Sequence, residues 1–454
     1  MGTALDDSKL HCTVAELFTP RAKRQRWLDV EAALARAEAD AGLVPGAAAE
    51  AIMSVARLDL LDYDALLAAE AAAGHVMVPL VNALAEAVGA EHGGWVHWGA
   101  TTQNIQQSGD TVGVARAHRI LVNRLRRVLV ALADLADTHA ETLMAGRTHG
   151  QHAVPITFGY KAAVWADLIG RHLARLQQAE PRLFVAMLGG AAGTFATFGT
   201  AGPDVQQRFA EQLGLAPMPI PSRAMVDHLA EWVCLLGMVA ATAQSIAEEV
   251  IRLMASEFGE VSESLAATDV GSSTMPQKRN AKLSMGIVTA AAQARALVPL
   301  ALEATVQAHE VDGARSAMMD RAIEGSATLL DDILDRLERL LAGLEIHPER
   351  MRANLDLTGG LISAEAVMMR LAEVLGRQRA HAVVHHAARE SALNGDDFAA
   401  VLAREPAVAA TLSDAEIQAL LDPARHVGLS AELARQTAAR VPEASGGRPS
   451  PAAG

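Results

Sequence analysis

The sequence predicts an all-α protein, and three observations lead to this prediction. About half of the 454 residues are hydrophobic, but only 3% are aromatic, so the apolar content is mostly Ala, Leu, Val and Met, which favour helices over strands. Several segments repeat apolar residues at spacings of three and four, as amphipathic helices do. The strict alternation of apolar and polar residues that indicates a strand does not persist anywhere.

The first hundred residues are predicted to form short helices followed by a polar loop. The segment Arg21–Ala41 is dense in Ala, Leu, Glu and Arg, and Gly42–Gly46 (GLVPG) stops this helix. The segment Glu91–Asn104 lacks helical periodicity and places polar side chains among glycines. We therefore expect an ordered loop there that presents polar groups, as functional loops do.

The middle of the chain is expected to consist of long helices. Wide apolar faces made of small residues usually pack against other helices, including those of other subunits, so we expect an oligomer. Polar loops are predicted at Gly146–Pro155 and Ser262–Asn280, and smaller helices between Pro348 and Val441. The long helices are predicted at Ile105–Thr142, Ile156–Gln178, Val226–Phe258, Lys282–His309 and Arg315–Leu344.

Charge and composition exclude several classes of partner. The net charge of −14 argues against nucleic acids and anionic membranes, which are bound by clusters of lysine and arginine. Cys12 and Cys234 are far apart and lack the CxxC spacing of a zinc site, which favours a reducing cytoplasm. The apolar stretch Trp232–Ala247 looks too short and too mixed to span a bilayer. We expect a cytoplasmic protein without a metal or another cofactor.

The segment Gly271–Asn280 (GSSTMPQKRN) holds the most informative group of residues. Gly271 and Pro276 keep it out of a helix, and it combines two serines with Lys278, an arginine and Asn280. A serine hydroxyl is a poor base unless positive charge and donated hydrogen bonds stabilise its alkoxide, and Lys278 and backbone N–H groups can supply both. Such a loop can transfer protons beside an anion, whereas the alternative is a solvated basic turn.

This string resembles the signature loop of the fumarase/aspartase superfamily, which includes adenylosuccinate lyase and 3-carboxy-cis,cis-muconate cycloisomerase. His97–Asn104 (HWGATTQN) and Met144–Gly159 (MAGRTHGQHAVPITFG) resemble two other regions of that family in the expected order. The resemblance covers nearly the whole chain. It implies three helical domains, at 1–104, 105–345 and 346–454, whose long central helices form the core of a homotetramer with active sites shared between three subunits.

The resemblance also implies roles for the residues of the signature loop. Ser272 would be the general base that removes a proton next to a substrate carboxylate, and Ser273 is the weaker candidate for this role. Lys278 and Asn280 would hold that carboxylate as it gains charge. Such stabilisation of developing charge is often the largest contribution to catalysis.

The other two loops would bind the substrate and protonate the leaving group. The resemblance makes His149 the general acid, because an imidazole titrates near neutral pH and can donate a proton as the bond breaks. A lone histidine is more often structural, and only the RTHGQH context favours catalysis at His149. The weaker candidates are His75, His97 and His152. The carboxylates of the substrate would accept hydrogen bonds from Thr101, Thr102, Gln103 and Thr148.

Some positions separate the branches of the family. Bacterial carboxymuconate cycloisomerases typically have a tryptophan at the position of His149, so this residue favours the eliminating lyases. In contrast, HWGATTQN and Gly376–His381 (GRQRAH) look like the cycloisomerase branch. The segment His309–Ala322 matches poorly the stretch with which adenylosuccinate lyases bind a nucleotide phosphate, which argues against a purine substrate.

Met285 stands where many members place a glutamate that pairs with the catalytic histidine, and Ala281 stands where a proline is usual. Another acid, Glu263 or Asp269, would then orient His149. Alternatively, the leaving group needs little acid assistance because it is already a stable anion, such as nitrite from nitrosuccinate.

These observations favour a lyase that releases fumarate by β-elimination from a succinyl-type dicarboxylate. Cleavage of a C–N bond is favoured over C–O, in an adenylosuccinate-like compound, nitrosuccinate or another N-substituted succinate. Lactonisation of the 3-carboxy-cis,cis-muconate cycloisomerase type is the enzymatic alternative. A non-catalytic scaffold is the alternative of another class, and it is disfavoured because the expected site residues are all present.

Overall fold

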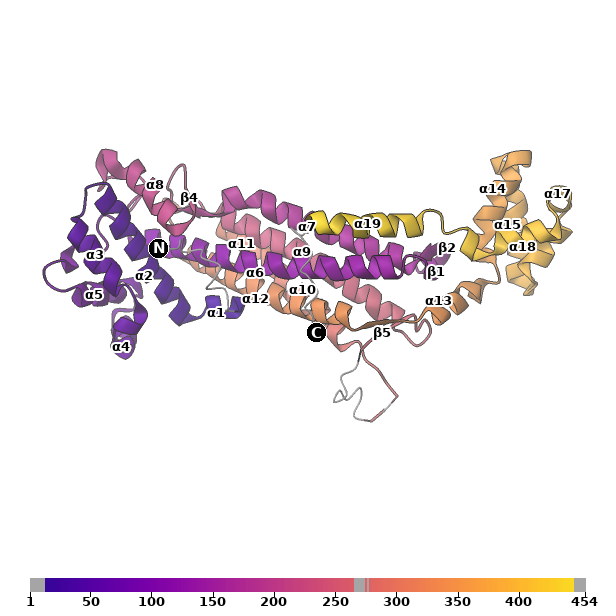
Figure 1. Ribbon diagram of the computed structural model, residues 1–454, viewed down its shortest axis with the longest axis horizontal. Coiled ribbons are helices and arrows are strands. Elements are labelled where there is room, and N and C mark those ends of the chain that lie inside the picture. Colours follow the sequence, from indigo (N-terminus) through magenta and orange to yellow (C-terminus); the bar gives the residue numbers. More distant parts are fainter. Residues whose placement is uncertain (1–12, 265–273, 276, 445–454) are drawn as a thin grey trace. The chain divides into compact units, whose positions relative to one another are not determined.

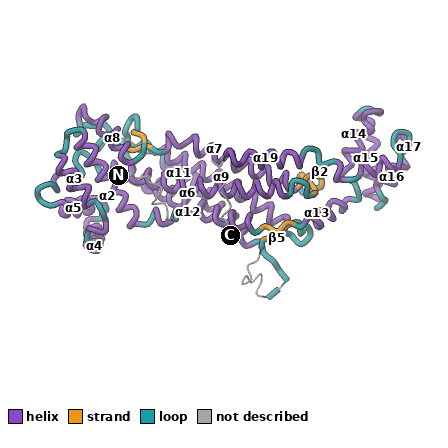
Figure 2. Tube along the Cα trace, viewed as in Figure 1, coloured by secondary structure: helices purple, strands orange, loops and turns teal. Residues whose placement is uncertain are grey.

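The computed structural model describes residues 13–264, 274–275 and 277–444. Helices dominate these residues, and the strands are short (Figure 2), which confirms the predicted all-α class. The chain forms two compact units. Unit 1 comprises 1–125, 172–241 and 289–335, and unit 2 comprises 126–171, 242–288 and 336–454. The division into three domains stays a prediction.

Five long helices (Figure 1) contribute residues to both units, and four of them match the predicted long helices closely. The single helix expected over Lys282–His309 is wrong, because the chain breaks at Leu297 and restarts with Pro299 in the first turn of α11 (Val298–Ala304). Proline fits a first helical turn but not a helix interior. The five shared helices are α6 (Thr102–Thr138), α7 (Phe158–Leu183), α9 (Asp227–Leu253), α10 (Lys282–Ala296) and α12 (Gly313–Ala342).

Unit 1 packs short helices around α2, which lies close to the predicted bounds. The Thr19 side chain accepts a hydrogen bond from Ala22 N, and Pro20 occupies the first turn, so the start of α2 is fixed by a side-chain cap and a preset φ. The core includes Leu28, Leu80 and Phe209, each fully buried. Unit 1 also contains α1 (Val14–Leu17), α2 (Pro20–Asp40), α3 (Gly46–Val55), α4 (Tyr63–Ala73), α5 (Met77–Val88), α8 (Gly202–Leu213), β3 (Val185–Ala186), β4 (Ala216–Pro217), and the 3₁₀ helices η2 (Leu58–Leu60), η3 (Gly93–Trp95) and η4 (Gly199–Ala201).

Unit 2 contains the remaining strands and a cluster of C-terminal helices with its own apolar core. The antiparallel strands β5 (Val261–Glu263) and β6 (Leu344–Ile346) pair directly. The other elements are α13 (Pro348–Leu355), α14 (Ala364–Leu375), α15 (Arg377–Asn394), α16 (Phe398–Arg404), α17 (Pro406–Ala409), α18 (Asp414–Leu421), α19 (Ser430–Ala444), β1 (Leu143–Thr148), β2 (Gln151–Thr157), and the 3₁₀ helices η5 (Asp356–Thr358), η6 (Leu361–Ser363) and η7 (Pro423–Arg425).

The loop predicted at Gly146–Pro155 is an antiparallel hairpin, so that prediction is wrong. Strands β1 and β2 pair from Leu143↔Thr157 to Thr148↔Gln151, with an irregularity between Gly146 and Arg147. This irregularity shifts the register, and Pro155 lies within β2, so the sequence does not show the regular alternation that would have predicted two strands.

Two helical stretches, Asp227–Leu253 and Lys282–Ala304, are long and apolar enough to cross a membrane by length and composition alone. The argument that Trp232–Ala247 is too short therefore does not hold, since α9 extends beyond it at both ends. In α9, 56% of the most apolar 18-residue stretch is buried inside the protein. A core helix of a soluble protein can be equally long and apolar.

Candidate active site

The first polar loop ends at the N-terminus of α6, where three predicted substrate-binding residues lie. Asn104 is fully buried, and its Oδ1 accepts a hydrogen bond from Thr101 N at 3.0 Å. Asn104 N in turn donates to Thr101 O at 2.8 Å. These bonds fix Thr101, Thr102 and Gln103 at the start of a 37-residue helix, where free N–H groups and the helix dipole favour anions such as carboxylates.

Gln103 is held from two sides, which sets the direction of its amide. Its Nε2 donates to Ser316 Oγ on α12 at 3.3 Å, and its Oε1 accepts from Arg223 Nη2 at 3.0 Å and Nε at 3.3 Å. Arg223 also donates to Ala191 O at 2.8 Å. Sequence reasoning missed Arg223, which lies 120 residues from Gln103 in the chain. It gave Ser316 no role, although Ser316 lies in the segment His309–Ala322 that was compared with a phosphate-binding stretch.

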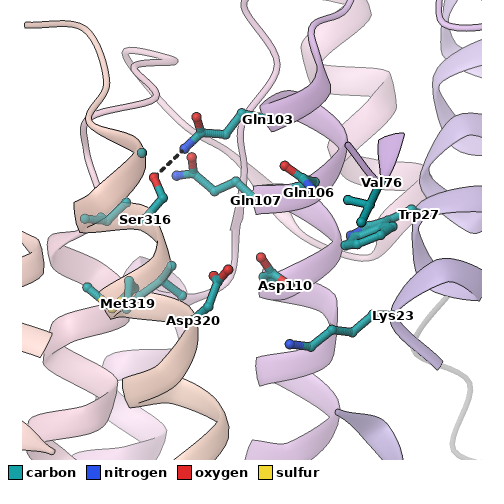
Figure 3. A pocket seen from close by; sticks show the side chains of 13 residues that line it. Lys23, Trp27, Val76, Gln103, Gln106, Gln107, Asp110, Ser316, Met319 and Asp320 are labelled. Carbon is teal, nitrogen blue, oxygen red and sulfur yellow. Dashed lines mark hydrogen bonds between the residues drawn. The ribbon is translucent and has the colours of Figure 1, made fainter. Parts of the chain in front are cut away.

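A cavity of about 390 Å³ lies beside Gln103 within unit 1. One wall is a face of α6, where Gln103, Gln107 and Asp110 follow at helical spacing, and Ser316 and Asp320 of α12 lie opposite (Figure 3). Burial and the neighbouring Asp320 raise the pKa of Asp110 to about 7, although Arg26 and Lys23 act against this shift. Burial also raises the pKa of Asp320, with Lys23 opposing.

His149 lies at the tip of the β1–β2 hairpin, in the two-residue turn between Thr148 and Gln151. His149 and Gly150 both have positive φ, 52° and 78°, as the central residues of a type I′ turn must. A left-handed conformation is unfavourable for a histidine and is maintained only when its surroundings require it, as often happens at functional sites. The side chains of Thr148 and His149 are exposed, so a substrate can reach them.

A buried ion pair anchors this hairpin next to its tip. Arg147 Nη1 and Nη2 donate to the two carboxylate oxygens of Glu260 at 2.9 and 2.6 Å. Glu260 is fully buried and also accepts a hydrogen bond from Asn354 Nδ2 at 2.7 Å. The Arg147 guanidinium lies 4.8 Å from the centre of the Phe258 ring. This bidentate, planar arrangement restrains the strand that leads into Thr148 and His149.

The signature loop is described only in part. Ser272 and Ser273, the predicted bases, lie outside the described residues, whereas Lys278 and Asn280 belong to unit 2 and Lys278 is exposed. Glu263 accepts hydrogen bonds from Leu283 N and Ser284 N, both at 2.9 Å.

Glu263 therefore caps α10 and joins the two ends of the segment that contains the signature loop. Both of its oxygens accept a backbone hydrogen bond in this way, and the expectation that Glu263 orients His149 stays a prediction. Asp269, the other acid considered for that role, lies outside the described residues.

The three weaker histidine candidates have local partners or surroundings that explain them. His75 Nδ1 accepts from Met77 N and Val78 N at 3.2 Å and caps α5. His97 Nδ1 lies 2.6 Å from Glu31 Oε1; burial opposes protonation, but the hydrogen bond and charge of Glu31 raise the pKa of His97. Burial and Arg147 lower the pKa of His152.

The structure thus places the predicted residues in two groups. Thr101, Thr102 and Gln103 lie together in unit 1, and Thr148, His149, Lys278 and Asn280 lie in unit 2.

Comparison with known proteins finds relatives that match over most of the chain. The family model described as "Lyase" matches residues 12–294, and the model described as "Adenylosuccinate lyase C-terminus" matches residues 360–437. The chain is 41% identical to a 3-carboxy-cis,cis-muconate cycloisomerase from Pseudomonas aeruginosa, with 91% of this chain and 90% of that protein covered. It is 35% identical to an N-acetyl-S-(2-succino)cysteine lyase from Enterococcus italicus, with 92% and 91% covered.

A solved structure of similar fold supports the same relationship. The crystal structure of a fumarate lyase from Mesorhizobium sp. BNC1 matches with a TM-score of 0.87 at 34% identity, over 98% of this chain and 99% of that chain. By their names, these relatives include a cycloisomerase, a succinocysteine lyase and a fumarate lyase.

Proposed function

We propose that this chain, which belongs to the fumarase/aspartase superfamily of lyases, releases fumarate from an N-substituted succinate by β-elimination. A base removes a proton from the carbon next to one carboxylate, the C–N bond breaks, and the amine leaves with a proton. The observation that carries this proposal is His149, an exposed imidazole in a left-handed turn beside the anchored Arg147. An amine leaving group needs such an acid.

The other roles are those that the resemblance of the three loops to the family implies. Ser272 is the proposed base, with Ser273 as its alternative, and Lys278 and Asn280 stabilise the carboxylate that gains charge. Thr101, Thr102, Gln103 and Thr148 bind the carboxylates. The helix N-terminus at Thr102 and the guanidinium of Arg223 on Gln103 support an anion at the first loop.

A homotetramer with sites shared between three subunits is part of the proposal. Members of this superfamily act on small dicarboxylates and are typically homotetramers. The long helices expose large apolar side chains in the single chain, including Val164, Met238 and Met285, which are 43–51% exposed. Exposed apolar residues on long helices favour packing against another subunit. We place the enzyme in the cytoplasm, and propose that it works without a metal or another cofactor.

The test is a panel of succinyl compounds with leaving groups of different basicity, assayed for fumarate by ultraviolet absorbance. Ser272→Ala is expected to abolish fumarate release from every substrate. His149→Gln is expected to lower kcat by about 10²–10⁴ for an amine leaving group, but far less for nitrosuccinate, whose leaving group is already a stable anion. Equal losses for both leaving groups would contradict the role of His149 as an acid.

Lactonisation of a carboxymuconate is the second candidate, and the 41% identity to a cycloisomerase favours it. This reaction uses the same proton transfer beside a carboxylate but closes a ring. Consumption of carboxymuconate without fumarate release, together with inactivity on every succinyl compound, would replace the first proposal by this one.

A further inference from the structure

The hydrogen bonds around the Gln103 side chain fix which end of its amide is the oxygen. A guanidinium can only donate, so the atom that accepts from Arg223 Nη2 at 3.0 Å and from Nε at 3.3 Å is the Gln103 oxygen. On the other side, Gln103 Nε2 donates to Ser316 Oγ at 3.3 Å (Figure 3), and Ser316 Oγ donates to Asp312 O at 3.2 Å. The amide is therefore held in one orientation, and its second N–H has no partner among the described residues.

The positive charge of Arg223 is not offset by a carboxylate within the described part of the chain. Its three hydrogen bonds go to neutral acceptors, Gln103 Oε1 and Ala191 O. Burial lowers the pKa of Arg223, because the guanidinium loses water without gaining an anion. Hydrogen bonds from a charged donor are strong and polarise the group that accepts them. The Gln103 amide thus becomes a better N–H donor than an amide that is bonded only to neutral groups.

The backbone that carries Arg223 is fixed against the first turns of α6. Gln107 Nε2 of α6 donates to Met225 O, two residues after Arg223, at 3.2 Å. Gly193 in the neighbouring glycine-rich loop has a φ of 81°, and a Cβ at this position would collide with Pro221 O. This close approach holds the segment that leads into Arg223 from the other side. The guanidinium is therefore positioned on Gln103 by the fold and not only by its own flexible side chain.

The cavity that Gln103 lines has little other positive charge to offer an anion. Among the described residues of its wall, Asp110 and Asp320 are acids, and the one lysine, Lys23, is already in an ion pair. The N-terminus of α6 favours an anion through its free N–H groups. Arg223 adds a full positive charge at the same end of the cavity, and this charge reaches the wall through the Gln103 amide.

We infer that Arg223 is a positioning residue of the first loop, which holds and polarises the Gln103 amide so that it donates an N–H to a carboxylate of the substrate. This inference rests on the proposed function, in which Gln103 binds a carboxylate of the succinyl group. Arg223 acts through Gln103 and takes no part in proton transfer. Its loss should therefore weaken binding of the carboxylate without slowing the chemical steps to the same extent.

The experiment measures fumarate binding by isothermal titration calorimetry in a double-mutant cycle of Arg223 and Gln103. Arg223→Met keeps a long apolar side chain but removes the charge and the donors, and it is expected to weaken binding by about tenfold. Gln103→Ala should weaken binding by a similar factor. In the Gln103→Ala protein, Arg223→Met should have less than about a threefold further effect, because residues that act as one unit are not additive.

Steady-state kinetics give a second readout, which a merely structural role would not move in the same way. With the succinyl compound that the enzyme converts best, Arg223→Met should raise KM by about tenfold and change kcat by less than about threefold, since it weakens ground-state and transition-state binding equally. Arg223→Lys keeps the charge as a single point donor, so its KM should lie between those of the wild type and Arg223→Met.

Arg208→Met is the matched control in unit 1. The Arg208 side chain is 41% exposed and pairs with Asp204 on the same helix at 2.8 Å, so this variant should leave KM and fumarate binding unchanged. Thermal unfolding shows that each variant is folded. If Arg223→Met does not fold, the cycle is run with Arg223→Lys, for which we expect about a threefold loss of fumarate binding that again disappears in the Gln103→Ala protein.

The outcomes separate this inference from the proposed function. Equal losses of fumarate binding with and without Gln103, unchanged binding in the folded Arg223 variant, or a fall in kcat at constant KM would each overturn the inference and leave the lyase proposal intact. An absence of fumarate release from every succinyl compound, together with no binding of fumarate to the wild type, would instead overturn the proposed function and the inference with it.

Discussion

The buried ion pair between Arg147 and Glu260, next to the tip of the β1–β2 hairpin, gives a quantitative prediction. Glu260→Ala removes both oxygens that accept hydrogen bonds from Arg147, at 2.9 and 2.6 Å, and the oxygen that accepts from Asn354. The Arg147 side chain is only 14% exposed, so its charge is left largely without water or an anion. The contact with the Phe258 ring remains and offsets part of this loss.

The expected loss of unfolding free energy is about 3–5 kcal/mol, the range for breaking one half of a buried pair. Two charge-assisted hydrogen bonds at roughly 1.5–3 kcal/mol each lead to a similar total. The assay is urea unfolding followed by circular dichroism, with all proteins at one concentration because subunit association also affects stability. Fumarate release should also fall, since the strand that leads to His149 loses its anchor.

The matched control is Glu338→Ala. Glu338 accepts two hydrogen bonds from Arg127, both at 3.0 Å, but the Arg127 side chain is 56% exposed. Water can therefore solvate this arginine, and the loss should be below about 1 kcal/mol. A loss for Glu260→Ala no larger than that of the control would refute the reasoning that burial makes this pair important.

Three further predictions concern stability and the signature loop. Glu38 is fully buried, and its carboxylate has no hydrogen-bond partner among the described residues. Burial and the charge of Glu31 raise the pKa of Glu38 to about 9. Glu38→Gln should therefore increase the free energy of unfolding by up to about 3 kcal/mol at pH 7. The pKa of Glu38 is raised from 4.5 in the folded protein, so the wild type has its full stability below pH 4.5 and loses stability as the pH rises toward 9. The difference between the variant and the wild type in chemical unfolding should therefore vanish near pH 4. Gly159→Ala would place a Cβ 2.5 Å from Ala136 O. Thermal unfolding should show that the free energy of unfolding falls by about 1–3 kcal/mol. An unchanged melting midpoint would show that α6 and α7 are not tightly packed at this position. Glu263→Ala removes the cap of α10 and should lower the free energy of unfolding by about 1 kcal/mol. It should also reduce kcat, because the signature loop would lose the contact that joins the two ends of its segment. Full activity would show that the cap does not position this loop.

The long helices could be predicted from the sequence because their periodicity depends only on local spacing. The predicted helix over Ile105–Thr142 corresponds to α6 (Thr102–Thr138), and Arg21–Ala41 corresponds to α2. The hairpin around His149 could not be predicted in the same way. Its strands contain Gly146, Pro155 and a register shift, and these features remove the simple alternation on which strand prediction depends.

The candidate site was predictable only where its residues lie together in the sequence. Gln103 and His149 belong to contiguous motifs, whereas Arg223 reaches Gln103 from 120 residues away, and Glu260 reaches Arg147 from 113 residues away. Tertiary contacts of this kind leave no local pattern. The acidic cavity was missed for the same reason, because Asp110 and Asp320 come together only when α6 and α12 pack.

The most direct test of the central claim is to identify the products by proton NMR. The purified protein is incubated in parallel with a panel of N-substituted succinates and with 3-carboxy-cis,cis-muconate. We predict that fumarate and the free amine form in equal amounts from one of the succinates and that the muconate is unchanged. Conversion of the muconate to a lactone, with no fumarate from the succinate, would contradict the account.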